Sequence, residues 1–272
     1  MRTAFAALCA LATAVALAFL VLPVVAIFLR VSPVELLRSL GQDVTRDALL
    51  VSLKTSAIAH VSVLVFGTPA AWVLARKRFR ARGLVLSLVE LPLVLPPAVA
   101  GIALFAAFGR AGLLGSELDA LGIQIPFTQT AVVLAVAFVE SPFYLRGAIA
   151  AFEAVDDSLL DAARTLGASP ARVFARVGLP LAAGGLGAAS ALALARGLGE
   201  FGATLIFAGS LQGVTQTLPL AIYAQLDVDP PTAIAIGALL VCLSLAILLL
   251  VRTLPSWTRF TSISLTRSDA SV

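Results

Sequence analysis

Apolar residues along the chain fall into long blocks that are separated by short polar stretches. Each block is near the roughly 20 residues that a helix needs to cross a bilayer. The six blocks cover residues 4–29, 48–75, 84–108, 127–149, 181–207 and 231–251. The pattern therefore predicts an all-α integral membrane protein with about six transmembrane helices. The first block is longer than the core of a signal peptide, so we expect a retained helix, with cleavage as the alternative.

Two of the blocks contain residues that disturb a helix. Glu140 and Pro142 interrupt the fourth block, and backbone groups that such a proline frees must be satisfied inside a bundle. We expect this helix to pack among others. A structural hydrogen bond is the favoured role for Glu140, with a role in transport as the alternative. Pro92 and the pair Pro96-Pro97 predict a bend in the third block.

The composition agrees with a membrane protein and excludes other classes. Hydrophobic residues make up 60% of the chain and charged residues 12%, which is too little charge to cover a surface in water. The chain is basic, but its cations lie between apolar blocks, so a nucleic-acid partner is not expected. Cys9, Cys242 and the single histidine, His60, all lie in apolar blocks without the spacing of a metal site.

Charges in the connections predict the orientation. Lys and Arg concentrate on one side, and cytoplasmic loops carry such an excess. The cations on that side are Arg2, Arg76, Lys77, Arg78, Arg80, Arg82, Arg164, Arg172, Arg176, Arg252, Arg259 and Arg267. Most acidic loop residues lie on the other side. Both termini are therefore expected in the cytoplasm.

The cytoplasmic connection over residues 151–180 predicts two short amphipathic helices. Asp156 or Asp157 can cap the first helix. Gly167 fits the left-handed position that ends a helix, and Pro170 fits the first turn of the next one. Physical reasoning alone leaves open whether the helix pair docks on a partner or lies on the lipid.

A motif in this connection resembles the signature loop of ABC importer permeases. That pattern is Glu-Ala-Ala, three residues, Gly, nine residues, an aliphatic residue, any residue and Leu-Pro. The matching residues here are Asp161, Ala162, Ala163, Gly167, Val177, Leu179 and Pro180. Spacing agrees throughout, and Asp161 replaces the usual glutamate with a shorter acid. Pro180 is also expected to end the second helix and to begin the next membrane span.

The resemblance implies a type I ABC importer permease fold, a transport complex of several subunits and a division of the chain into domains. Two permease copies form the path, two ATP-binding subunits receive the coupling loops, and an extracytoplasmic binding protein delivers cargo in a bacterial cytoplasmic membrane. This chain has no phosphate-binding loop, so a separate ATPase uses ATP and Mg, and this chain binds no cofactor and performs no catalysis. Residues 1–47 are expected to form a first helix and outward loop, 48–252 the permease domain, and 253–272 a cytoplasmic tail.

Two segments suggest the cargo. Residues 199–209 resemble the molybdate and sulfate branch of these permeases, and residues 216–223, expected as a short helix along the outer surface, resemble the molybdate members. Arg196 and Glu200 are four residues apart and share a helix face, with Thr204 one turn further. These three are candidates for an anion path, and a self-neutralising structural pair is the alternative.

Other cargoes and other classes of membrane protein are the alternatives to a molybdate permease. Tungstate or sulfate could replace molybdate as cargo within the same family. A secondary anion transporter or channel would need no ATPase, but such proteins often show inverted repeats with broken helices, and we find no such repeat. A membrane enzyme would need a reactive constellation of side chains, and none is assembled in the sequence.

Overall fold

The computed structural model describes residues 2–252, and every regular element in that range is helical. Five helices are long and apolar enough to cross a membrane, and a bent pair makes a sixth span. The expected fold class is therefore confirmed, while the expected tail at 253–272 lies outside the described residues. The elements are α1 (Arg2–Arg30), α2 (Pro33–Leu40), α3 (Asp43–Arg76), α4 (Arg82–Val94), α5 (Pro97–Phe108), α6 (Gly115–Ala120), α7 (Gln129–Glu153), α8 (Asp157–Thr165), α9 (Pro170–Val173), a π-helical turn (Phe174–Gly178), α10 (Leu179–Leu198), α11 (Gly202–Ala208), α12 (Leu218–Gln225) and α13 (Pro230–Arg252).

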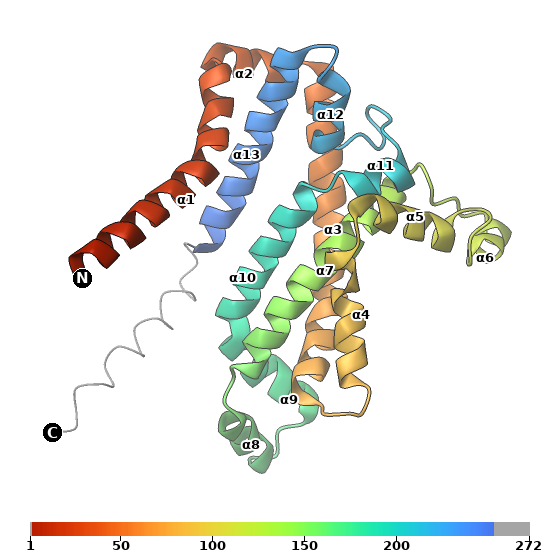
Figure 1. The fold of residues 1–272 in the computed structure, drawn as a ribbon. Helices are drawn as coiled ribbons and strands as arrows, with labels where there is room; N and C mark the ends of the chain where they lie inside the picture. Colours follow the sequence, from red (N-terminus) through yellow and green to blue (C-terminus); the bar gives the residue numbers. More distant parts are fainter. Residues whose placement is uncertain (1, 253–272) are drawn as a thin grey trace.

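Helices α3, α7 and α10 form the centre of the subunit (Figure 1). Glycines let α7 and α10 approach closely. A Cβ atom on Gly147 would lie 2.5 Å from the Cβ of Ala189, and one on Gly185 would lie 2.5 Å from the Cβ of Ala151. Contacts this short do not occur between real side chains, so a small residue is required at each crossing. The small residues of the fifth block therefore place its helix at the centre of the subunit.

A polar network links the same three helices. Glu140 of α7 is fully buried, and one of its carboxylate oxygens contacts Nδ1 of His60 on α3. Nε2 of His60 lies 2.8 Å from Oγ of Ser190 on α10. Glu140 thus makes the hydrogen bond inside the bundle that the sequence favoured. Pro142 lies inside α7 without breaking it, and the expectation that this helix packs among others is also confirmed.

The third apolar block is broken rather than only bent. The chain bends by 117° between the two halves of the block, α4 and α5, and Leu95 between them has an extended conformation. Pro96 and Pro97 lack backbone N–H groups, and a residue before proline is pushed out of the helical region, so the helix cannot continue. The bend predicted at these prolines is therefore confirmed, and it is sharp enough to divide the block into two helices.

The fifth block also differs from its prediction, because α10 ends at Leu198 and α11 starts at Gly202. The expected short outer helix is present as α12. Its residues Leu218 and Ala221 are buried against α3 and α13, while Tyr223 is 61% exposed. Helix α1 extends away from the central bundle beside α13 (Figure 1), and no residue of its most apolar window is buried.

Candidate functional site

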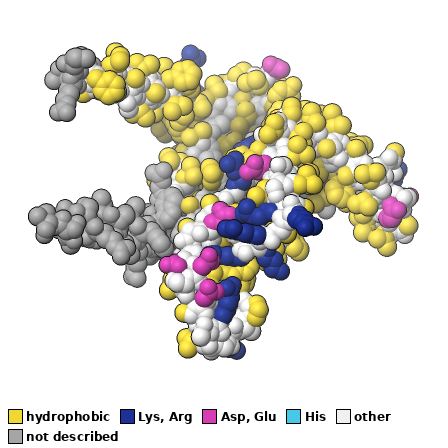
Figure 2. All heavy atoms as spheres, turned by 60° about the horizontal axis from the view of Figure 1, so that its bottom comes forward, with side chains coloured by type: hydrophobic (Ala, Val, Ile, Leu, Met, Phe, Trp, Pro, Cys, Tyr) yellow, Lys and Arg dark blue, Asp and Glu magenta, His cyan; other side chains and the backbone are white. Residues whose placement is uncertain are grey.

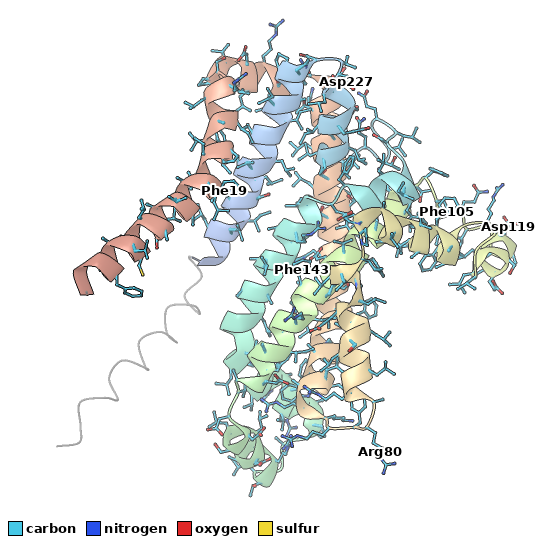
Figure 3. All side chains as sticks on the ribbon, viewed as in Figure 1. Phe19, Arg80, Phe105, Asp119, Phe143 and Asp227 are labelled. Carbon is cyan, nitrogen blue, oxygen red and sulfur yellow. The ribbon has the colours of Figure 1, made fainter. Side chains whose placement is uncertain are left out.

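The connection between α7 and α10 lies at the cationic end of the bundle. Figure 3 places Arg80 at this end of the bundle, the end at which α8 lies in Figure 1, and Asp227 at the opposite end. Figure 2, which turns this end toward the reader, shows Lys and Arg side chains gathered over it. The Lys and Arg residues that the sequence assigns to one side of the membrane thus gather at one end of the bundle.

Helix α8 is fixed at both ends by local hydrogen bonds. At its start, the Asp156 carboxylate accepts from the backbone N–H of Ser158 at 2.9 Å, and this bond lowers the pKa of Asp156. At its end, Gly167 has φ +81°, and the backbone N–H groups of Gly167 and Ala168 donate to the carbonyls of Arg164 and Ala163. This pair of bonds is a Schellman motif, which needs a left-handed residue at the glycine. Both predicted signals are confirmed.

The second predicted helix does not stop at Pro180. Helix α9 runs through the π turn into α10, so residues Pro170–Leu198 form one continuous helix of 29 residues. A proline ring clashes with the carbonyl four residues earlier in a regular α-helix, and the wider π turn that ends at Gly178 relieves this conflict. The expected break before the membrane span was therefore wrong.

The end of α3 holds the connection in place. The Arg76 guanidinium donates to Asp157 at 2.5 Å, to the Val155 carbonyl at 2.8 Å and to the Phe152 carbonyl. It also lies 5.4 Å above the ring of Trp72. Arg76 thereby joins α3 to the end of α7 and to the start of α8.

Trp72 packs into the same junction. The centroid of its ring lies 5.2 Å from that of Phe152, which it meets edge-on, and 5.4 Å from that of Phe174. A Cβ atom on Gly178 would lie 2.5 Å from the Trp72 ring, so the π turn and the tryptophan fit only because this residue is a glycine. Sequence reasoning interpreted Arg76 only as a topology signal and missed Trp72, although their spacing of four residues on one helix could have indicated a joint site.

The signature residues divide into an inner and an outer set. Ala163, Val177 and Leu179 are half-buried against the body, while Asp161, Ala162, Gly167 and Pro180 are exposed. Asp161 pairs with Arg164 at 2.6 Å on the surface. Leu166 is 88% exposed at the tip of α8, whereas Leu160 is fully buried. The connection therefore presents a rigid tip with an exposed apolar residue and paired charges.

The candidate path residues are only partly brought together. Arg196 Nη1 lies 3.0 Å from Glu200 Oε2, with Arg196 33% exposed and Glu200 1% exposed. The other Glu200 oxygen accepts from the Ala203 N–H at 2.8 Å. Thr204 is fully buried, and its hydroxyl donates to the Phe201 carbonyl at 2.8 Å. The expectation that Thr204 continues the same helix face was wrong, because the helix ends before Glu200.

Comparison with known protein families identifies the family of this chain. A family model described as "Binding-protein-dependent transport system inner membrane component" matches residues 65–260. The chain belongs to this family. The fold of the chain is that of a type I ABC importer permease.

Relatives and solved structures agree with the family assignment. A Molybdenum transport system permease protein ModB from Mycobacterium bovis is 47% identical over 231 residues, which cover 85% of this chain and 88% of the relative. A Sulfate transport system permease protein CysW from Synechocystis is 36% identical over 237 residues, or 85% of each chain. A chain of a bacterial alginate ABC transporter superposes with a TM-score of 0.69 at 15% identity, covering 89% of this chain and 90% of that one, and shows the shared fold.

Proposed function

We propose that this chain is the membrane subunit of an importer that moves an oxyanion, molybdate first of all, into the cytoplasm. The similarity to a permease named for molybdenum transport, at 47% identity over most of both chains, carries this proposal. Sulfate is the second candidate, because a permease named for sulfate transport is 36% identical over a similar length. Tungstate shares the charge and shape of molybdate and is included as a competitor.

Coupling to a separate ATPase rests on the signature loop. Its exposed tip carries Leu166, which can fill an apolar groove on a partner, and the Asp161–Arg164 pair, which can lie at the rim. The junction of Arg76 with three groups of the loop fixes this tip relative to α3 and α7. A push on the tip would therefore move the membrane helices rather than bend the loop.

The assembly follows from the same proposal. Two copies of this chain enclose the path, two ATP-binding subunits dock on the loops, and an oxyanion-binding protein docks on the opposite face. The cationic end with the loop then faces the cytoplasm, together with both termini. Arg196 and Glu200 are the proposed path contacts, since a mostly neutralised arginine can meet an anion without trapping it.

Uptake by the complete complex in proteoliposomes tests the proposal. We expect molybdate uptake that requires ATP and the binding protein, strong competition by tungstate and weak competition by sulfate. Equal competition by sulfate would assign the chain to sulfate transport instead. Uptake that continues without ATP would refute the importer mechanism and favour a secondary transporter.

A further inference from the structure

A groove between α4 and α7 carries charged residues that the proposed path does not use. Its volume is about 240 Å³, and two ion pairs line it. Arg82 Nη2 lies 2.6 Å from Glu153 Oε1, and Arg146 Nε lies 3.3 Å from Glu90 Oε1. Both pairs lie toward the end of the bundle that carries the signature loop.

The inner pair is exposed in the subunit although it lies within membrane helices. The side chains of Arg146 and Glu90 are 61% and 47% exposed. Arg146 is seven residues before the end of α7 at Glu153, about 10 Å along the axis at 1.5 Å per residue. Ionisable groups at such positions face a bundle interior or a water-filled cavity, because lipid cannot solvate them. The groove therefore faces water or another protein surface.

One face of α7 connects the groove with the proposed path. Phe143, Arg146 and Glu153 of α7 follow each other at intervals of three and seven residues, which keeps them on one helix face. The guanidinium of Arg196 lies over the Phe143 ring, 6.0 Å from its centroid, and Figure 3 shows Phe143 beside α10. This face of α7 thus leads from the Arg196–Glu200 pair to the groove and on to the end of the bundle that carries the signature loop.

We infer that this groove is the inner half of the oxyanion path, with Arg146 as an anion contact and Glu90 as its exchangeable counterion. This inference rests on the proposed function. The carboxylate occupies the arginine between passages and competes with the cargo, so that the anion is released toward the cytoplasm. The longer distance of this pair, compared with that of Arg82 and Glu153, suits a partner that must be displaced.

Thiol labelling tests whether the groove contains water. In the complete complex, with Cys9 and Cys242 replaced by alanine, a cysteine is placed at Val89, which lines the groove, or at its neighbour Leu88, which is exposed outside it. We expect a membrane-impermeant reagent on the cytoplasmic side to label Val89→Cys, and molybdate to slow that labelling. We expect Leu88→Cys, at the same depth, to stay unlabelled. Equal labelling of the two positions, or none at Val89→Cys, would overturn the inference.

Transport by Glu90→Gln tests the counterion role. Without the competing carboxylate, Arg146 should hold the anion more tightly, with a KM for molybdate about tenfold lower, the factor expected for one charge-assisted hydrogen bond, and a lower maximal rate. A structural pair alone would lower the amount of folded complex and leave KM unchanged, which would also overturn the inference. Labelling of Val89→Cys without any added anion does not depend on the identity of the cargo, so failure of molybdate uptake by the unaltered complex would refute the proposed function separately.

Discussion

Replacement of Gly167 by valine should uncouple transport from ATP hydrolysis. Gly167 has φ +81°, and nothing lies within 4 Å of an added Cβ atom, so a side chain meets backbone strain but no steric obstacle. A left-handed conformation costs an L-residue about 1–2 kcal/mol, and a β-branched residue more. A cost of this size changes the population of the closed Schellman turn by a factor of roughly 5–30. The turn would open and α8 would lose its fixed direction, while the membrane helices stay intact.

The assay measures molybdate uptake and ATP hydrolysis together in proteoliposomes that contain the complete complex. We expect Gly167→Val to hydrolyse ATP with several-fold less uptake per ATP. Gly167→Asn should keep most of the coupling, because asparagine tolerates the left-handed region better than other residues. Gly83→Val is the matched control, since Gly83 also has free space around it but lies in α4 without a positive φ. An unchanged ratio of uptake to hydrolysis in Gly167→Val would refute this explanation of the loop.

Three further changes test the junction around the loop. Arg76→Lys should lower uptake per ATP several-fold, because the single nitrogen of lysine cannot reach all the acceptors that two guanidinium nitrogens contact. Arg80→Lys, on the exposed surface, should change nothing, and equal effects of the two variants would contradict the role of the junction. Gly178→Leu should clash with Trp72 and lower the melting temperature of the complex. A melting temperature equal to that of the wild type would show that the π turn tolerates a side chain. Asp156→Ala removes the carboxylate that caps α8 and whose pKa is lowered by the capping hydrogen bond. The stability that the cap contributes should be present at neutral pH and should disappear as the pH falls through the lowered pKa. A difference in stability between variant and wild type that persists in acid would argue against capping.

The sequence predicted the features of the loop that are decided locally. An aspartate can cap a helix through its own side chain, and Gly167 can adopt a left-handed conformation at little cost, so Asp156 and Gly167 marked the two ends of α8 correctly. Apolar block lengths likewise predicted the membrane helices, because the thickness of a bilayer sets that length. These signals depend on a few neighbouring residues or on the solvent alone.

Features that depend on tertiary packing were not predictable in the same way. Proline usually ends a helix, yet Pro180 lies in a continuous one because a π turn that fits against Trp72 absorbs the clash. The Arg76 junction joins residues about 80 positions apart, and no local pattern indicates that pairing. The pair of Arg196 and Glu200 was found for an incomplete reason, since the helix whose face they were expected to share ends at Leu198.

The uninterrupted helix from Pro170 to Leu198 has a mechanical consequence. At 1.5 Å per residue it is about 43 Å long, and a rotation of about 5° at its base would displace its far end by roughly 4 Å. Arg196 lies near that far end, beside the break that precedes α11. The helix is thus a continuous lever, with the proposed ATPase-docking loop at one end and the proposed anion contact at the other. A small tilt at the membrane surface is amplified at the depth where cargo must be admitted or released.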